Sequence, residues 1–161
     1  MRAIILILLA AAVGLGVLAS QQAATIKEQQ GQIAAANDRR KSEVLGLQAQ
    51  CAKQAKAAWV DGGNSNSPMA SYENHYNATL NKCFMYMQSY QIISGNGYDN
   101  RTLVDVLENK SYGLYILHVM NGKGEGRLRP VKCTVQTVSG EVVDCESKDD
   151  FEARVKPYME G

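Results

Sequence analysis

The sequence predicts an α+β fold, with N-terminal helices packed on an antiparallel β-meander of four to five strands and a short C-terminal helix. Three observations support this prediction. Residues 21–59 are rich in the helix formers Gln, Ala, Lys and Glu and contain no Pro. Between residues 83 and 146, apolar and aromatic runs alternate with clusters of turn-forming residues. Four cysteines lie in the same region as these elements, which predicts two disulfides.

Length and composition limit the class of protein. The chain has 161 residues, the size of one ordinary domain, and 45% of them are hydrophobic against 20% charged, which excludes wholesale disorder. Lys and Arg number 17 and Asp and Glu number 16, so the net charge is +1. Because this balance is nearly neutral, the chain shows no global preference for nucleic acid or for an anionic membrane surface.

The N-terminus carries an export signal. Met1-Arg2 is a short positive region, and residues 3–19 contain no polar side chain. Cleavage after Ala19 is typical of a secretory signal peptide, whereas an uncleaved segment is a signal anchor. We therefore expect residues 1–19 to be one of the two. Either places the remaining chain outside the cytoplasm, in the periplasm or anchored to the inner membrane and facing the periplasm.

Two helical regions follow. We expect residues 20–41 to form a frayed or stalk-like helix, because their apolar residues are sparse. Residues 42–161 form the predicted folded domain, and its first helix, 42–59, is amphipathic. The polar run 37–41 is a candidate interruption between the two helices.

The segment after the loop at 61–68 is predicted as a second helix. Tyr72, Tyr76 and Leu80 step by four residues, so the helix begins near Pro68 or Ser71. Residues 83–93 are rich in aromatic residues, which favours a strand. A continued helix is the alternative, because positions 80, 84 and 87 share a helical face.

The remaining elements are four strands and a helix. Residues 103–108 and 112–120 form two strands joined by Asn109-Lys110, preceded by a loop over 94–100. After a glycine-rich loop at 121–126, residues 131–137 and 141–146 form a hairpin. Ser147 is the predicted N-cap of a closing helix that ends near residue 159.

The hairpin register predicts the disulfides. A three-residue loop, 138–140, with Gly at the left-handed position pairs residue 137 with residue 141 and sets Cys133 opposite Cys145. Directly opposed residues lie within disulfide reach. By elimination Cys51 pairs with Cys83. The cysteine spacing contains no C-x-x-C pair, so zinc and redox-enzyme interpretations are weak.

A small polar cluster is the candidate binding site. On a helix, Tyr72 and Tyr76 would form an aromatic patch, with His75 on a neighbouring face. Asn74, His75 and Asn77 are hydrogen-bonding groups beside this patch, so together with Tyr76 they could hold a ligand or tie the predicted helix to the loop at 62–68. The other histidine, His118, lies in an apolar strand, where a buried, hydrogen-bonded imidazole is expected.

Charged residues offer weaker candidates. On a predicted strand, Asp105 and Glu108 point to opposite faces and make a poor acid–base pair. The basic glycine loop over residues 123–129 could contact phosphate, although a solvated loop is favoured.

Together these features favour a binding protein over an enzyme. No G-x-S-x-G, H-E-x-x-H or P-loop motif is present, so no catalytic residue, metal or cofactor is predicted. We expect a non-enzymatic binding or assembly module of the bacterial envelope, with an envelope protein as its partner. One alternative is a small periplasmic hydrolase or ligand-binding enzyme centred on His75. Another is a structural component that oligomerises through the stalk.

Three stretches resemble a group of small exported bacterial proteins of uncharacterised activity, marked by an N-H-Y-N-x-x-L-N-K-C-F motif and structural cysteines. The resemblance implies an exported domain with structural cysteines and carries no activity or catalytic residue. At Val106-Leu107 the sequence departs from the group, which there has an aspartate-alanine pair. The stretches are 51–55 with 74–84, 103–112, and 145–152 with the end near Tyr158-Met159.

Overall fold

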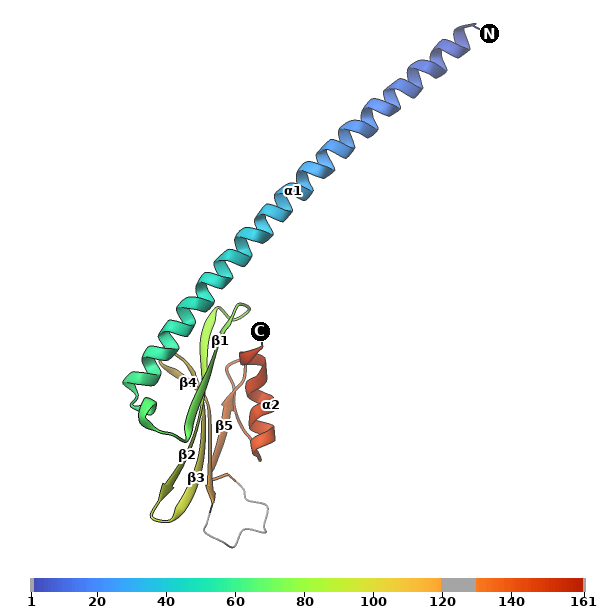
Figure 1. Ribbon diagram of the computed structural model, residues 1–161. Helices are drawn as coiled ribbons and strands as arrows, with labels where there is room; N and C mark the ends of the chain where they lie inside the picture. The colour runs from blue at the N-terminus through green and yellow to red at the C-terminus, as the bar shows by residue number, and fades with distance from the viewer. Residues whose placement is uncertain (1, 120–129, 161) are drawn as a thin grey trace. The chain divides into compact units, whose positions relative to one another are not determined.

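The computed structural model describes the backbone of residues 2–119 and 130–160, and the side chains of these residues except 2–21, 23, 24 and 66. The chain divides into two compact units, Met1–Val44 and Leu45–Gly161. The basic glycine loop expected at 123–129 lies outside the described residues. The elements in chain order are α1 (Arg2–Asp61), η1 (Asn64–Asn66), β1 (Ala70–Asn77), β2 (Lys82–Ile93), β3 (Asn96–Asp105), β4 (Lys110–Val119), β5 (Lys132–Gln136), β6 (Val142–Asp144) and α2 (Lys148–Met159) (Figure 1).

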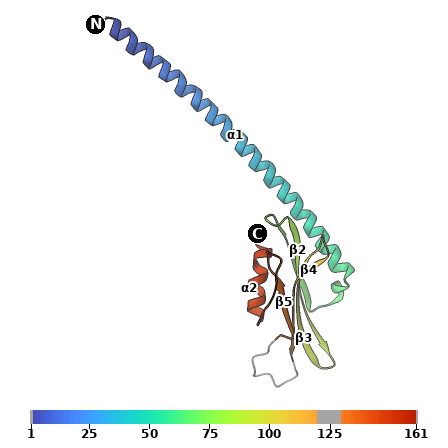
Figure 2. The same cartoon turned by 180° about the vertical axis from the view of Figure 1, so that it is seen from behind.

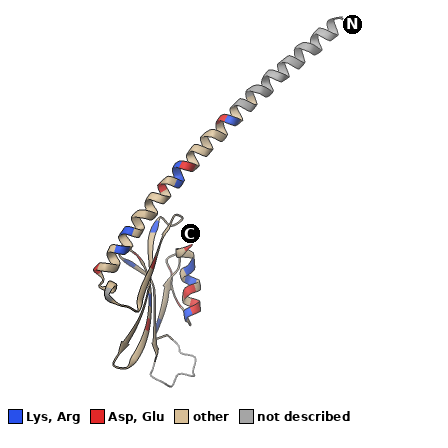
Figure 3. Cartoon of the chain, viewed as in Figure 1, with Lys and Arg blue, Asp and Glu red and all other residues tan. Residues whose placement is uncertain are grey.

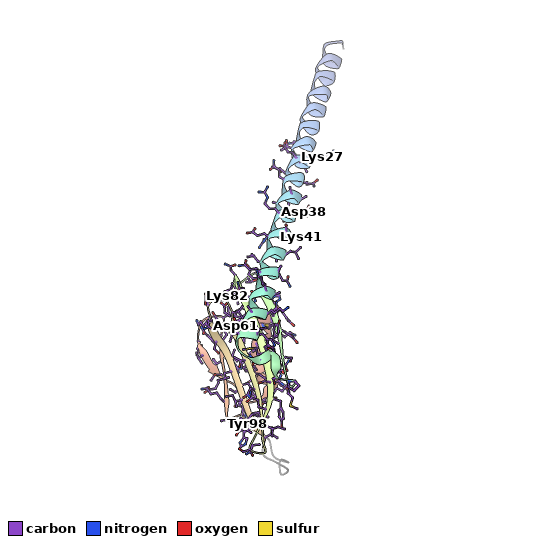
Figure 4. All side chains as sticks on the ribbon, turned by 60° about the vertical axis from the view of Figure 1, so that its left-hand side comes forward. Lys27, Asp38, Lys41, Asp61, Lys82 and Tyr98 are labelled. Atoms are coloured by element: carbon purple, nitrogen blue, oxygen red, sulfur yellow. A yellow bond between two sulfur atoms is a disulfide. The ribbon has the colours of Figure 1, made fainter. Side chains whose placement is uncertain are left out.

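The first unit is the N-terminal part of α1. This helix continues without a break through residues 37–41, so the expected interruption there is wrong. The run contains no Pro or Gly and its Arg and Lys residues are good helix formers, which explains the continuity. All side chains from residue 25 to 43 are exposed, and Figure 4 shows Lys27, Asp38 and Lys41 projecting from the helix.

The predicted signal peptide or signal anchor at residues 1–19 depends on side chains outside the described residues. Within the described part of the chain, no helix holds a stretch that is long and apolar enough to cross a bilayer.

The second unit is built around one antiparallel sheet. Its six strands follow the chain order β1-β2-β3-β4-β5-β6, which is a meander. The fold is therefore α+β as predicted, with one strand more than expected. Every neighbouring pair of the described strands is antiparallel, and among them the register shifts once, between Leu103 and Val104 of β3. The closing helix also forms as predicted, with Ser147 as its N-cap.

Helix α2 covers one face of the sheet, which we call the α2 face (Figures 1 and 2). Strand register places Phe84, Leu103 and Val135 on this face. Phe151 and Tyr158 of α2 pack among them, and each is no more than 1% exposed. Phe84 meets the Tyr158 ring edge-on at 5.1 Å between centroids. This cluster is the main hydrophobic core of the domain.

The last turns of α1 pack on the opposite face, over β1 and β2. Cys51 forms a disulfide with Cys83, and Tyr76 closes the same buried cluster. Trp59 lies against Tyr72 with 4.9 Å between ring centroids. A helix that makes few backbone contacts with the sheet is thus fixed to it by a covalent bond and aromatic packing.

The second disulfide closes the β5–β6 hairpin. The register pairs Val135 with Val143, and Cys145 N–H donates to the Cys133 carbonyl at 3.0 Å. Gly140 has a φ of 92°, the left-handed conformation that the three-residue loop requires. The Cys133–Cys145 disulfide spans 5.0 Å between Cα atoms. The pairing predicted from hairpin register is therefore confirmed, as is that of Cys51 with Cys83.

The predicted second helix near residues 68–80 is wrong, since Ala70–Asn77 is strand β1. Residues four apart share a face in a strand as well as in a helix, so the spacing of Tyr72 and Tyr76 fits both. The hairpin is closed by a turn in which Asn81 has a φ of 53°. Pairing with β2 supplies the partner that makes this segment extended.

Strand β2 forms where a strand was favoured, and the loop predicted after it is shorter than expected. Residues 83–93 are a strand, as favoured. The expected loop over 94–100 shrinks to a tight turn at Ser94-Gly95, both with positive φ, and β3 begins at Asn96. Positive φ at two successive residues suits the twist of a two-residue hairpin.

Candidate functional site

The predicted binding cluster lies on β1, and its four residues do not share one face. Alternation along the strand places His75 and Asn77 on the α2 face, and Asn74 and Tyr76 on the opposite face. His75 and Asn74 are half-buried. The binding role of this cluster stays a prediction, but the strand divides its groups between the two faces of the sheet.

Two members of the cluster are structural. Asn77 is 1% exposed. Its amide donates to the carbonyls of Pro157 and Tyr158 at 3.0 and 3.2 Å, and its Oδ1 accepts from Leu80 N–H at 2.9 Å. Asn77 therefore satisfies carbonyls that the end of α2 leaves without intrahelical partners. The Tyr76 hydroxyl, also in the interior, lies 2.6 Å from Asn81 Oδ1 and donates to it.

His118 is stacked on Tyr98. Its ring lies parallel to that of Tyr98, with 4.8 Å between centroids and 9° between planes. Its Nε2 is buried and has no hydrogen-bond partner in the described part of the chain. The expected hydrogen bond to this atom is therefore absent there.

Two charged networks tie the elements together. Arg101, 8% exposed, donates to the Tyr86 hydroxyl at 3.1 Å and contacts Glu152 of α2 at 2.5 Å. Burial raises the pKa of the Tyr86 phenol. The hydrogen bond and the positive charge of Arg101 lower this pKa, but by less than burial raises it. The contact between Arg101 of β3 and Glu152 joins α2 to the sheet.

The second network corrects a prediction. Lys82 Nζ lies 3.0 Å from Asp105 Oδ2 and 2.6 Å from Glu108 Oε1, so both carboxylates converge on one ammonium. Glu108 is in the turn after β3 rather than on a strand, which is why the expected opposite orientation fails. Hydrogen bonding to Glu108 is the main cause that raises the pKa of Lys82. Both carboxylates are therefore paired with the Lys82 ammonium.

An apolar groove lies on the α2 face at the outer end of the sheet. It has a volume of about 240 Å³. Val135 and Val143 form its floor, and the β5–β6 turn forms one end, where Val138 is 61% exposed. Helix α2 supplies the wall through Arg154, Pro157 and Tyr158.

A smaller hollow of about 80 Å³ lies on the opposite face of the same edge. Leu114, Thr134, Gln136 and Val142 line it, and strand register puts these side chains on the face away from α2. The two hollows therefore flank strand β6 on its two sides. Sequence reasoning missed both, because the groove depends on how α2 crosses the hairpin and the smaller hollow depends on how β4, β5 and β6 pair. The only local sequence signal was an apolar residue, Val138, in a glycine turn.

The lining of the groove is mainly apolar. Its lining offers aliphatic and aromatic surface, and its one cation, Arg154, is held by Asp150 at 2.8 Å. Among the described residues, no group of three or more His, Cys, Asp or Glu side chains is placed to hold a metal ion. The two disulfides are consistent with an oxidising, exported location.

Comparison with known proteins finds no matching family model, no similar curated protein and no similar solved structure. The resemblance to small exported bacterial proteins thus stays a prediction from sequence.

Proposed function

We propose that this chain is an exported bacterial envelope protein that acts as a non-enzymatic binding or assembly module. The observation that carries the proposal is the apolar groove between the β5–β6 hairpin and α2. Apolar surface of this kind, rimmed by polar residues, marks sites for a partner's side chains. The frame around it is rigid, because the Cys133–Cys145 disulfide closes the hairpin and Tyr158 donates a hydrogen bond to the Gln136 carbonyl.

Location in the periplasm, free or anchored to the inner membrane, is part of the proposal. The apolar segment at residues 3–19 supports export. Disulfides persist in oxidising compartments, and both bonds here are buried. An alkaline phosphatase fusion at the C-terminus is expected to be active, because that enzyme also needs an oxidising compartment. Fractionation of the cells then separates the anchored form from the cleaved form.

Site-specific photo-crosslinking in living cells tests the binding function. A photoreactive amino acid replaces Val138 at the groove, His75 on β1, or Leu107 as the control. Leu107 is comparably exposed, at 54%, but lies in the β3–β4 turn. We expect a discrete crosslinked partner from Val138 and none from Leu107. Equal labelling from all three positions, or none from Val138 and His75 under any growth condition, contradicts the proposal.

A second candidate function is self-assembly through the stalk. Ile26 and Ile33 are 54% and 61% exposed on the helix and lie seven residues apart, the spacing of a coiled-coil seam. Analytical ultracentrifugation of the chain with and without residues 20–41 tests this function. An oligomer that forms only when residues 20–41 are present supports this function. A monomer both with and without these residues contradicts it.

A further inference from the structure

Strand β6 is an open edge of the sheet. Among the strands that the structure describes it pairs only with β5, and Val142 and Asp144 are exposed. Cys145 N–H bonds to the Cys133 carbonyl and Thr137 N–H bonds to the Glu141 carbonyl, so odd-numbered residues of β6 face β5. In an antiparallel ladder the alternate residues point the other way. The N–H and C=O groups of Val142 and Asp144 therefore face outward, ready to pair with another strand.

The positions of the two hollows, one on each face of the sheet, match the alternating directions of the side chains on an added strand. Successive side chains of a strand point to opposite faces. A residue placed opposite Val143 would direct its side chain to the α2 face, where the groove lies. Its two neighbours, opposite Val142 and Asp144, would point to the other face, where the smaller hollow is lined by Thr134 and Gln136. The geometry therefore fits an aliphatic residue flanked by small polar residues.

The negative charge beside β6 favours some partner strands over others. Glu141, Asp144 and Glu146 are exposed on and beside β6. None of the three forms an ion pair within the part of the chain that the structure describes. The same edge of a second copy would oppose like charges, which disfavours self-pairing. A segment with Lys or Arg at its ends would be attracted instead.

We infer that β6 binds an extended segment of a partner protein, in which an aliphatic residue lies between small polar residues and basic residues flank them. The segment adds to the sheet as a seventh strand, with its backbone bonded to Val142 and Asp144 and its aliphatic side chain in the groove. The inference rests on the proposed binding function and names the chemical class of the partner.

Peptide binding to the purified full-length chain in detergent micelles tests this inference. The probe is a fluorescein-labelled peptide, Lys-Thr-Leu-Thr-Lys, followed by fluorescence anisotropy. The matched peptides are Glu-Thr-Leu-Thr-Glu and Lys-Thr-Ala-Thr-Lys. We expect the lysine-flanked leucine peptide to bind about tenfold more tightly than either, because it alone has both the charge and the aliphatic side chain.

Three substitutions test where the peptide binds. Val142→Pro removes an outward N–H of β6 without removing a bond to β5, and it is expected to weaken binding about tenfold. Ala70→Pro, at the first residue of β1, places a proline at the opposite edge: Tyr90 N–H bonds to the Met69 carbonyl, so even-numbered residues of β1 face away from β2, and only a turn bond from Ala70 N–H to the Ser67 carbonyl is lost. This control is expected to bind like the unchanged protein. Asp144→Lys keeps the backbone intact and is expected to reverse the preference toward the glutamate-flanked peptide.

The outcomes separate this inference from the proposed function. Equal affinity for the three peptides, equal loss in both proline variants, or no binding of any probe overturns the inference. If a partner is still crosslinked from Val138 in those cases, the binding function stands and only the strand-addition mode fails. Reversal of the charge preference by Asp144→Lys supports the inference even if Val142→Pro perturbs the hairpin.

Discussion

Asn77 shows how a residue that looks suited to ligand binding is used inside the fold. Its side chain joins the β1–β2 turn to the C-terminal end of α2 through three hydrogen bonds. We expect Asn77→Ala to lower the free energy of unfolding by about 1–3 kcal/mol, because buried carbonyls lose their donors. Chemical denaturation measures this loss. Asn74→Ala, on the half-exposed neighbour, is the control and is expected to change stability little; equal effects would contradict the structural role.

Gly113 is a second position where a single atom matters. A Cβ there would lie 3.1 Å from Phe151 Cε2 and 3.5 Å from Leu103 Cβ, inside the main core. We expect Gly113→Ala to destabilise the domain by about 1–3 kcal/mol, since the Phe151 ring is fixed by its neighbours and must shift. Thermal unfolding followed by circular dichroism measures the effect.

The control for that substitution is Gly46→Ala. Gly46 lies within α1, and a Cβ there meets nothing within 4 Å. Alanine favours a helix over glycine by roughly 1 kcal/mol, so a small gain in stability is expected. A loss at Gly46 as large as that at Gly113 would show that the Phe151 contact is not the cause.

At the scale of elements, sequence reasoning succeeded where several local signals agreed. The β5–β6 hairpin combined a glycine turn, a shared apolar face and two cysteines, and its register follows from those three together. Strand β1 offered only tyrosines four residues apart, a spacing common to both periods. What decides its conformation is the pairing with β2, a tertiary contact absent from the local sequence.

The candidate site follows the same logic. The groove is formed by Val143 of β6, Val138 of the turn and Pro157 of α2. Each residue is unremarkable in sequence, and only the crossing of α2 over the hairpin brings them together. The groups singled out from sequence, His75 and its neighbours, were chosen for their chemistry on an assumed helix. On a strand they divide between two faces.

The start of α2 gives a prediction for pH dependence. Asp150 accepts from Arg154 and from the Glu146 backbone N–H, and the Arg154 bond is the main cause that lowers its pKa. A carboxylate with a lowered pKa in the folded state stabilises the fold above its ordinary pKa of about 4 and loses that contribution as pH falls.

We therefore expect Asp150→Asn to flatten the acid limb of a plot of melting temperature against pH, below about pH 4. Asp149→Asn, the same charge change one residue earlier, lacks the bonds to Arg154 and Glu146 and serves as the control. Parallel acid limbs in the unchanged protein and Asp150→Asn would rule out this contribution.

At the scale of the whole molecule, charge is confined to particular surfaces. Figure 3 shows Lys, Arg, Asp and Glu concentrated along α2 and the stalk, with fewer on the sheet. Three of the ion pairs join α2 residues to each other or to Arg101 of β3, and a fourth joins Lys156 of α2 to the C-cap residue Glu160. Because the pairs that do not involve Arg101 are exposed and contribute little, the core and the disulfides carry most of the stability of the domain.

The two disulfides differ in what they hold together. Cys51–Cys83 closes a segment of 32 residues and joins α1 to the sheet, whereas Cys133–Cys145 closes 12 residues within one hairpin. The entropy removed from the unfolded chain grows with loop length, so the longer loop contributes roughly 1 kcal/mol more. Replacing Cys51 and Cys83 by Ala is therefore expected to destabilise the domain more than replacing Cys133 and Cys145.

Calorimetry on the two double variants measures this difference, and limited proteolysis adds a readout specific to α1. Without the Cys51–Cys83 bond, the helix end is held mainly by Leu47, Tyr76 and the Trp59–Tyr72 contact. Cleavage between residues 45 and 68 is expected to accelerate in that variant alone, because the disulfide no longer prevents the end of the helix from separating from the sheet. Faster cleavage in the hairpin variant at the same sites would show instead that both bonds act only through global stability.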